Sequence, residues 1–152
     1  MMIIQFFFAM LGTIAFSILF QAPRREIIFC GFTGGLGWIV YYTLINTGMN
    51  HIFSCTVATV ILTILARCFA SLRRNPATVY LVAGILPLVP GAGIYYTAYY
   101  LVNSDKTLFL EKGLETFEFA AAIGFGILIG FSIPQKLFNR TFSRQHKSGG
   151  SQ

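Results

Sequence analysis

Apolar runs of about twenty residues, with few charges inside them, restrict the fold of this chain more than any other feature. The runs are Ile3–Gln21, Ile27–Asn46, Ile52–Ala70, Ala77–Val102 and Thr116–Ile133. A helix needs about 20 mainly apolar residues to cross a hydrocarbon core of about 30 Å. Because only 11% of the residues are charged, the sequence predicts an all-α integral membrane protein of about five transmembrane helices, surrounded by the lipid bilayer.

The same runs set the domain organisation. We expect residues 1–134 to form one five-helix transmembrane domain. Residues 135–152 are expected to form a basic, partly disordered cytoplasmic tail, because this stretch combines basic residues with a Ser/Gly-rich end. Five crossings leave no room for a soluble domain in a chain of 152 residues.

Loop charges predict the orientation of the chain. With five crossings, one face of the membrane carries nine basic residues and the other carries two: Arg24, Arg25, Arg67, Arg73, Arg74, Lys136, Arg140, Arg144 and Lys147 against Lys106 and Lys112. Basic loops are retained in the cytoplasm, so we expect an outside N-terminus and a cytoplasmic C-terminus in the cell inner membrane. A re-entrant 77–102 segment would put the basic tail outside, so the charges favour a full span.

Composition and motif content argue against several function classes. The net charge of +6 indicates orientation in a membrane protein rather than nucleic-acid binding. Cys30, Cys55 and Cys68 lie in apolar runs without a CxxC pair, and His51 and His146 are far apart. We therefore predict neither a metal site nor a cofactor. The chain offers no Ser/His/Asp or Cys/His set for an enzyme.

The fourth apolar run is interrupted at its centre by a Pro-x-x-Pro-Gly motif. Pro87 and Pro90 lack the N–H groups that would bond the carbonyls of Ala83 and Leu86, so a continuous helix would leave both acceptors without their usual partners. Such a break is tolerated where neighbouring helices or a water-filled cavity satisfy it. It divides the run into two halves of similar length, which places it near the middle of the bilayer.

Two half-helices that meet there direct free N–H groups and free carbonyls toward one place, an arrangement suited to a carboxylate and a cation. Glycines allow a ligand to approach the backbone, and tyrosines supply hydroxyls. The predicted substrate-binding residues at the break are Pro87, Pro90, Gly91, Gly93, Tyr95 and Tyr96. The alternative is a packing kink followed by an aromatic belt at the membrane surface.

Charged residues near the apolar runs leave alternatives open. Arg67 lies inside the third run, where it either partners a substrate carboxylate or snorkels to the headgroups. Glu111, Glu115 and Glu118 have i, i+4 and i+7 spacing, which places them on one face of any helix that begins the fifth span early. We interpret them as favourable charge at a helix N-terminus, except that Glu118 lies deepest and is the one candidate proton site.

Two GxxxG spacings, Gly31–Gly35 and Gly126–Gly130, lie in the second and fifth runs. Small residues let transmembrane helices approach closely. Packing within this chain is the default expectation, and contact with another subunit is the alternative.

Several short motifs together resemble the small, five-helix subunit of the threonine/serine exporter family, over about residues 5–133. They are Pro23-Arg24-Arg25, Gly34-Gly35-Leu36-Gly37-Trp38, Ala66-Arg67, Pro76-Ala77-Thr78-Val79 and Ile85-Leu86-Pro87-Leu88-Val89-Pro90-Gly91. The resemblance implies a secondary transporter that exports small polar metabolites, either threonine/serine-type amino acids or dicarboxylates such as succinate.

The resemblance also implies partners. It predicts a larger membrane subunit that carries the other five-helix half, with the two halves related by inverted topology. A homo-oligomer is a second possibility for assembly. A non-transporting membrane scaffold or assembly protein is the alternative function.

Overall fold

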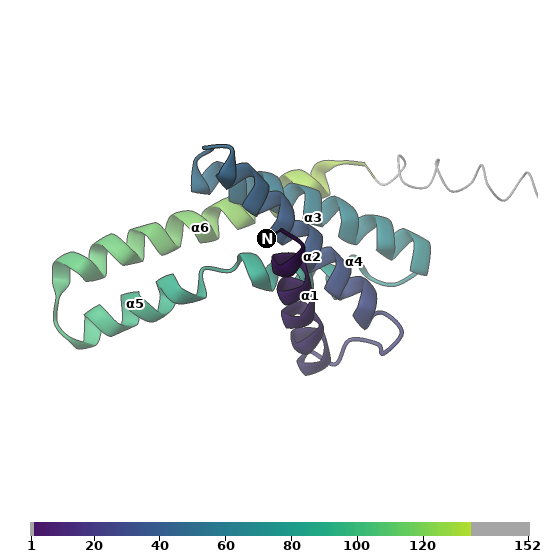
Figure 1. The fold of residues 1–152 in the computed structure, drawn as a ribbon, viewed down its shortest axis with the longest axis horizontal. Helices are drawn as coiled ribbons and strands as arrows, with labels where there is room; N and C mark the ends of the chain where they lie inside the picture. Colours follow the sequence, from purple (N-terminus) through teal and green to yellow (C-terminus); the bar gives the residue numbers. More distant parts are fainter. Residues whose placement is uncertain (1, 135–152) are drawn as a thin grey trace, which may run out of the picture.

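The computed structural model describes residues 2–134, which form six α-helices and a short 3-10 helix, with no strand among them (Figure 1). The elements are α1 (Met2–Leu19), α2 (Ile27–Asn46), α3 (His51–Arg73), α4 (Ala77–Ile85), η1 (Leu86–Leu88), α5 (Gly91–Val102) and α6 (Lys106–Ser132). The predicted all-α class is confirmed. The predicted tail, 135–152, lies outside the described residues.

Helix length and hydropathy identify the candidate membrane crossings. Among the described residues, α1, α2, α3 and α6 are each long and apolar enough to cross a bilayer. Two shorter segments pass the same test together: α4 with η1 (Ala77–Leu88), and α5 (Gly91–Val102). The two segments are bent by 59° relative to each other. The chain is thus a multi-pass membrane protein with four crossings, or five if the bent pair is one span.

The relative direction of α3 and α6 favours five. Gly126 of α6 lies against Thr59 of α3, and Gly130 lies against Thr63. From the first contact to the second, the position on α6 and the position on α3 both advance by four residues. The two helices therefore run parallel, as Figure 1 also shows. A segment that entered and left the bundle at the same end would make α3 and α6 antiparallel. The bent pair therefore spans the bundle once.

The four glycines of the two GxxxG spacings contact other helices of the same chain. A Cβ on Gly31 would lie 2.6 Å from Ile14, and one on Gly35 would lie 2.7 Å from Phe6, both in α1. Gly126 and Gly130 meet α3, whose threonine hydroxyls donate to carbonyls one turn earlier and so present methyl groups to the glycines. These close approaches hold α1 on α2 and α6 on α3.

Two helices extend beyond the predicted apolar runs. The third helix continues past Ala70, the end of its predicted run, to Arg73, and it ends only where Arg74 adopts a left-handed conformation (φ 55°) before Pro76. At the other end of the molecule, α6 begins at Lys106, ten residues before the predicted start of the fifth span.

The early start of α6 has a local cause. Asp105 caps the helix, because its side chain accepts a hydrogen bond from the N–H of Leu108 at 3.2 Å. Seven of the ten residues from Lys106 to Glu115 are Leu, Lys or Glu, which favour helix, so the polar stretch continues α6 ahead of the predicted run.

The helices form a bundle with a projecting hairpin. The buried core lies between α2, α3, α4 and the second half of α6, around Leu62, Ala66 and Tyr80. By contrast, α5 has no buried residue and packs mainly against the first half of α6. This α5–α6 hairpin extends away from α1–α4 (Figure 1). The break between α4 and α5 thus lies where the hairpin leaves the bundle.

Candidate functional site

The break begins with a tightened helical turn. Leu86 donates its N–H to the carbonyl of Ala83, and Val89 donates to the carbonyl of Leu86 at 3.2 Å. These i+3 bonds replace the i+4 bonds that the prolines cannot make. Both carbonyls therefore have a donor, and the expected pair of open acceptors for a cation is not formed.

The other side of the break presents backbone N–H groups. In α5 the helical i→i−4 pattern begins when Ile94 donates to the carbonyl of Pro90 at 3.1 Å, and Gly91 donates to the carbonyl of Val89 at 2.8 Å. The N–H groups of Ala92 and Gly93 precede that pattern, at the positions where a helix leaves its amides without an intrahelical acceptor. Partial positive charge accordingly gathers at the start of α5.

A cavity of about 340 Å³ opens at this point, between the break, α2 and the first half of α6. Its volume is in the range of small-molecule sites. It is lined by Trp38, Tyr41, Pro87, Leu88, Val89, Pro90, Gly91, Ala92, Gly93, Tyr96, Lys112, Glu115, Thr116 and Phe119. Five of the six predicted residues at the break therefore share one cavity, and Tyr95 does not.

The two glycines of the break differ in their surroundings. A Cβ on Gly91 would meet nothing within 4 Å, so this position borders open space. A Cβ on Gly93 would collide with Oγ1 of Thr116, so this glycine is needed for the contact between α5 and α6. Only Gly91 can accept a side chain without moving a helix.

The wall opposite the break carries charge that the sequence analysis did not place in the site. Lys112 and Glu115 form an ion pair with 2.8 Å between Nζ and Oε2, and their side chains are 34% and 55% exposed. Thr116 donates to the carbonyl of Lys112 at 2.6 Å. The i, i+3 spacing of Lys112 and Glu115 was available in the sequence, but both residues lie before Thr116, where the predicted fifth run begins. The exposure of both charges indicates that the cavity is open at this end.

A second cavity, of about 310 Å³, lies beside the first and is lined by Gln5, Phe8, Ala9, Trp38 and Pro87. Trp38 and Pro87 line both cavities. The indole N–H of Trp38 donates to Oε1 of Gln5 at 2.9 Å, which fixes the ring between α1 and α2. Trp38 is therefore a wall of the site that the sequence analysis missed.

The structure separates Arg67 from the cavity. Its side chain is buried between α3 and α6, where one guanidinium nitrogen donates to the carbonyl of Gly130 at 2.7 Å and the group lies 5.5 Å from the ring centre of Phe131. From Phe119, the cavity residue farthest along α6, to Gly130 the helix rises about 17 Å, at about 1.5 Å per residue. Glu118 is exposed and does not line the cavity.

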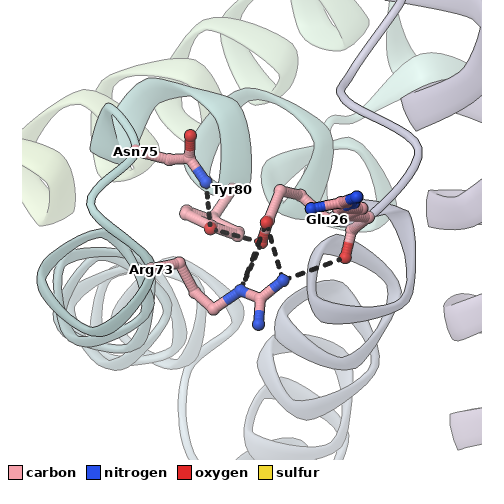
Figure 2. Close-up of polar contacts among 5 residues, drawn as sticks. Glu26, Arg73, Asn75 and Tyr80 are labelled. Carbon is pink, nitrogen blue, oxygen red and sulfur yellow. Dashed lines mark hydrogen bonds and ion pairs between the residues drawn. The ribbon is translucent and has the colours of Figure 1, made fainter.

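A second polar cluster lies where α2 begins, α3 ends and α4 begins (Figure 2). Arg73 donates to both carboxylate oxygens of Glu26, from Nε at 3.1 Å and from a terminal nitrogen at 2.9 Å. Tyr80 donates to the same carboxylate at 2.7 Å, and Asn75 donates to the Tyr80 hydroxyl at 3.5 Å. Hydrogen bonding from Arg73 holds the pKa of Glu26 below its usual value.

Glu26 was also missed by the sequence analysis, although a signal was present. It is the sole acidic residue before Asp105. A lone carboxylate at the end of an apolar run needs a partner, but the partners are 47 and 54 residues away along the chain.

A multi-pass helical bundle with a small-molecule cavity at an interrupted helix is typical of membrane transport proteins. Comparison with known families gives the particular class. The chain matches the family described as threonine/serine exporter, ThrE, over residues 5–133. The protein therefore belongs to the threonine/serine exporter family.

Two relatives illustrate this relationship. A probable threonine/serine exporter of Mycobacterium tuberculosis is 28% identical over 123 residues, which cover 80% of this chain and 23% of that protein. An uncharacterized protein of Haemophilus influenzae is 23% identical over 137 residues, which cover 88% of this chain and 46% of that protein. This chain thus spans less than half the length of these relatives. No solved structure matches it.

Proposed function

We propose that this chain is one subunit of a secondary transporter that exports small polar metabolites, and that the cavity at the break is its substrate site. The observation that carries the proposal is the cavity of about 340 Å³ that the break shares with a charged wall of α6. Interrupted helices near the membrane centre form the substrate sites of many secondary transporters. The predicted residues Pro87, Pro90, Gly91, Gly93 and Tyr96 line this cavity.

The charges around the cavity favour a zwitterion. The start of α5 and the ammonium group of Lys112 attract a carboxylate, whereas the carboxylate of Glu115 accepts hydrogen bonds from an amino group. A threonine- or serine-like amino acid carries both groups. A dicarboxylate such as succinate would place its second charge near Glu115, which disfavours it unless Glu115 moves away.

The proposal includes a larger partner subunit. The relatives contain long additional segments in the same polypeptide, since this chain covers 23% and 46% of their lengths. A separate protein that supplies such a segment would complete the transporter. The unburied α5 helix offers it a membrane-embedded surface. A homo-oligomer is the alternative assembly.

We further propose that the protein lies in the inner membrane with its N-terminus outside and its C-terminus in the cytoplasm. The ends of α2 and α3 that carry Arg24, Arg25, Arg73 and Arg74 form the cytoplasmic side in this arrangement. The cavity, bordered by Lys112 at the opposite end of the bundle, then faces outward.

Deletion and complementation test the proposed function. Cells that lack this chain are loaded with a threonine- or serine-containing dipeptide or with succinate, and intracellular metabolite is measured over time. We expect accumulation that is relieved when the chain is restored together with its partner. Equal efflux with and without the chain, at normal levels of the partner, would instead support a scaffold role.

A further inference from the structure

The Glu26 cluster lies at the starts of α2 and α4, whereas the cavity lies farther along α2 and at the break after α4. Trp38 and Tyr41, in the second half of α2, line the cavity, whereas Glu26 directly precedes the first residue of α2. Arg73 is the last residue of α3, and Tyr80 lies in the first turn of α4. With the proposed orientation, the cavity is open to the outside and the cluster closes the cytoplasmic end.

The cluster is a compact three-helix contact. The carboxylate of Glu26 has a side-chain exposure of 5% and receives three donors from α3 and α4 at 2.7–3.1 Å. Tyr80 has no exposed surface. The guanidinium of Arg73 also lies 4.7 Å from the ring centre of Phe29 in α2 and donates to the carbonyl of Arg25. These contacts join the ends of α2, α3 and α4 (Figure 2).

The segment between the cluster and the cavity is tightly packed. Cys30 and Thr33 of α2, Leu62 of α3 and Ala83 of α4 are at most 2% exposed. A Cβ on Gly84 would lie 3.2 Å from Thr33, so α4 rests directly on α2. Neither described cavity is lined by these residues.

We propose that the Glu26–Arg73 ion pair, completed by Tyr80, is the cytoplasmic gate of the transport pathway, and that this structure is the outward-open form. The proposal rests on the proposed export function and adds residues to it that the cavity does not contain. Export requires the cavity to open to the cytoplasm at another stage. The ends of α2, α3 and α4 must then separate. The cluster is the polar contact among them, and it lies beside the ring of Phe69 in α3, which packs against Phe29 of α2 and Tyr80 of α4.

An ion pair suits this role because its two forms differ little in free energy. When the helix ends separate, water can hydrate the carboxylate and the guanidinium, which offsets much of the lost attraction. The aromatic contact of Phe69 with Phe29 and Tyr80 would instead expose apolar surface to water on separation, which favours the closed form. Tyr80 makes the contact depend on the position of α4, because its hydroxyl reaches Glu26 only when α4 lies against α2.

Cys30 is a natural reporter of this gate. It lies one turn beyond Glu26, is fully buried, and its thiol donates to the carbonyl of Val79 in α4 at 3.5 Å. In a variant that retains Cys30 alone, a charged, membrane-impermeant thiol reagent applied from the cytoplasmic side of inside-out vesicles should react slowly. Glu26→Gln should accelerate the reaction about tenfold, because the pair no longer favours the closed end.

A second reporter separates gating from local loosening. Gly91→Cys, in a chain without other cysteines, places a thiol where nothing lies within 4 Å and is labelled from the outside. If Glu26→Gln shifts the protein toward an inward-open form, labelling at position 91 should fall as labelling of Cys30 rises. Fraying of the helix ends would raise labelling of Cys30 and leave position 91 unchanged.

The experiment uses vesicles that contain the chain with its partner, and membrane levels and detergent gel filtration verify folding. Arg73→Gln, which removes the other half of the pair, should reproduce the reciprocal change if Glu26→Gln fails to fold. A protected Cys30 in both folded variants, or unchanged labelling at position 91, would overturn the gate. Labelling requires no transport, so failure of the gate is distinguishable from failure of the export function.

Discussion

Gly91→Val tests whether the break binds substrate or only bends the chain. The position borders open space, since a Cβ there meets nothing within 4 Å. Valine is no worse a helix former than glycine, so the substitution should not lower the amount of protein in the membrane. Its branched side chain would occupy the cavity beside the amide groups that begin α5.

The size of the effect follows from the interaction that is lost. A charge at a helix N-terminus is stabilised by about 0.3–1 kcal/mol when exposed and by up to about 2 kcal/mol when partly buried. Loss of about 1–2 kcal/mol corresponds to an affinity about 5- to 30-fold weaker. We therefore expect a higher apparent KM for export by that factor, with a further loss of maximal rate if the side chain also blocks passage.

The assay is efflux from metabolite-loaded cells that contain the partner subunit, with membrane levels quantified in parallel. Gly124→Val is the matched control, because Gly124 is also free of neighbours within 4 Å but does not line either cavity. Gly93→Val provides the contrast, since its collision with Thr116 should reduce the amount of folded protein. Unchanged export kinetics for Gly91→Val at normal levels would refute the substrate site and leave the break as a packing feature.

Three further predictions address the break, the buried arginine and the topology. Pro87→Ala combined with Pro90→Ala should restore a continuous helix, in which the amides at the start of α5 become bonded. Most export should then be lost while the amount of protein in the membrane stays normal, and full export would contradict this prediction. Arg67→Gln should lower the amount of folded protein, because loss of the hydrogen bond to the buried carbonyl of Gly130 costs about 1–3 kcal/mol. Export per molecule should not change, and a selective rise in KM for carboxylates would show that Arg67 reaches the substrate. A reporter fused after Lys147 should read cytoplasmic and one inserted at Ser104 should read external, and the same side for both would rule out five spans.

The elements that could be predicted from the sequence are those marked by local signals. The bounds of α2 and the outer bounds of the broken helix, Ala77 and Val102, agree with the expectation. Each of them coincides with a change from apolar to polar or proline-containing sequence. The predicted start of the fifth span, Thr116, was wrong, because the charged stretch before it is compatible with either a loop or a capped helix. Asp105 decides between them, and its capping role depends on its conformation rather than on its identity alone.

The candidate site was predictable only in part, because six of its fourteen lining residues come from distant segments. The break itself was visible as a motif, but Trp38 joins it through the packing of α2 on η1, and Lys112 and Glu115 join it through the packing of α6 on α5. For Arg67, the sequence indicated burial but did not identify the hydrogen-bond partner. Its place inside an apolar run indicated a buried role, yet only the parallel packing of α3 on α6 identifies its acceptor as the carbonyl of Gly130.

One short helix, α4, connects the proposed gate and the proposed substrate site. Tyr80, near the start of α4, holds the carboxylate of Glu26, and the break begins directly after Ile85 at its end. These points are separated by about 8 Å of rigid helix, at about 1.5 Å per residue. A displacement of α4 that withdraws Tyr80 from Glu26 must also move the first wall of the cavity. Gly84 brings no side chain into the contact of α4 with Thr33, so at this point α4 and α2 do not interlock. The gate and the substrate site therefore share the element whose movement would couple them.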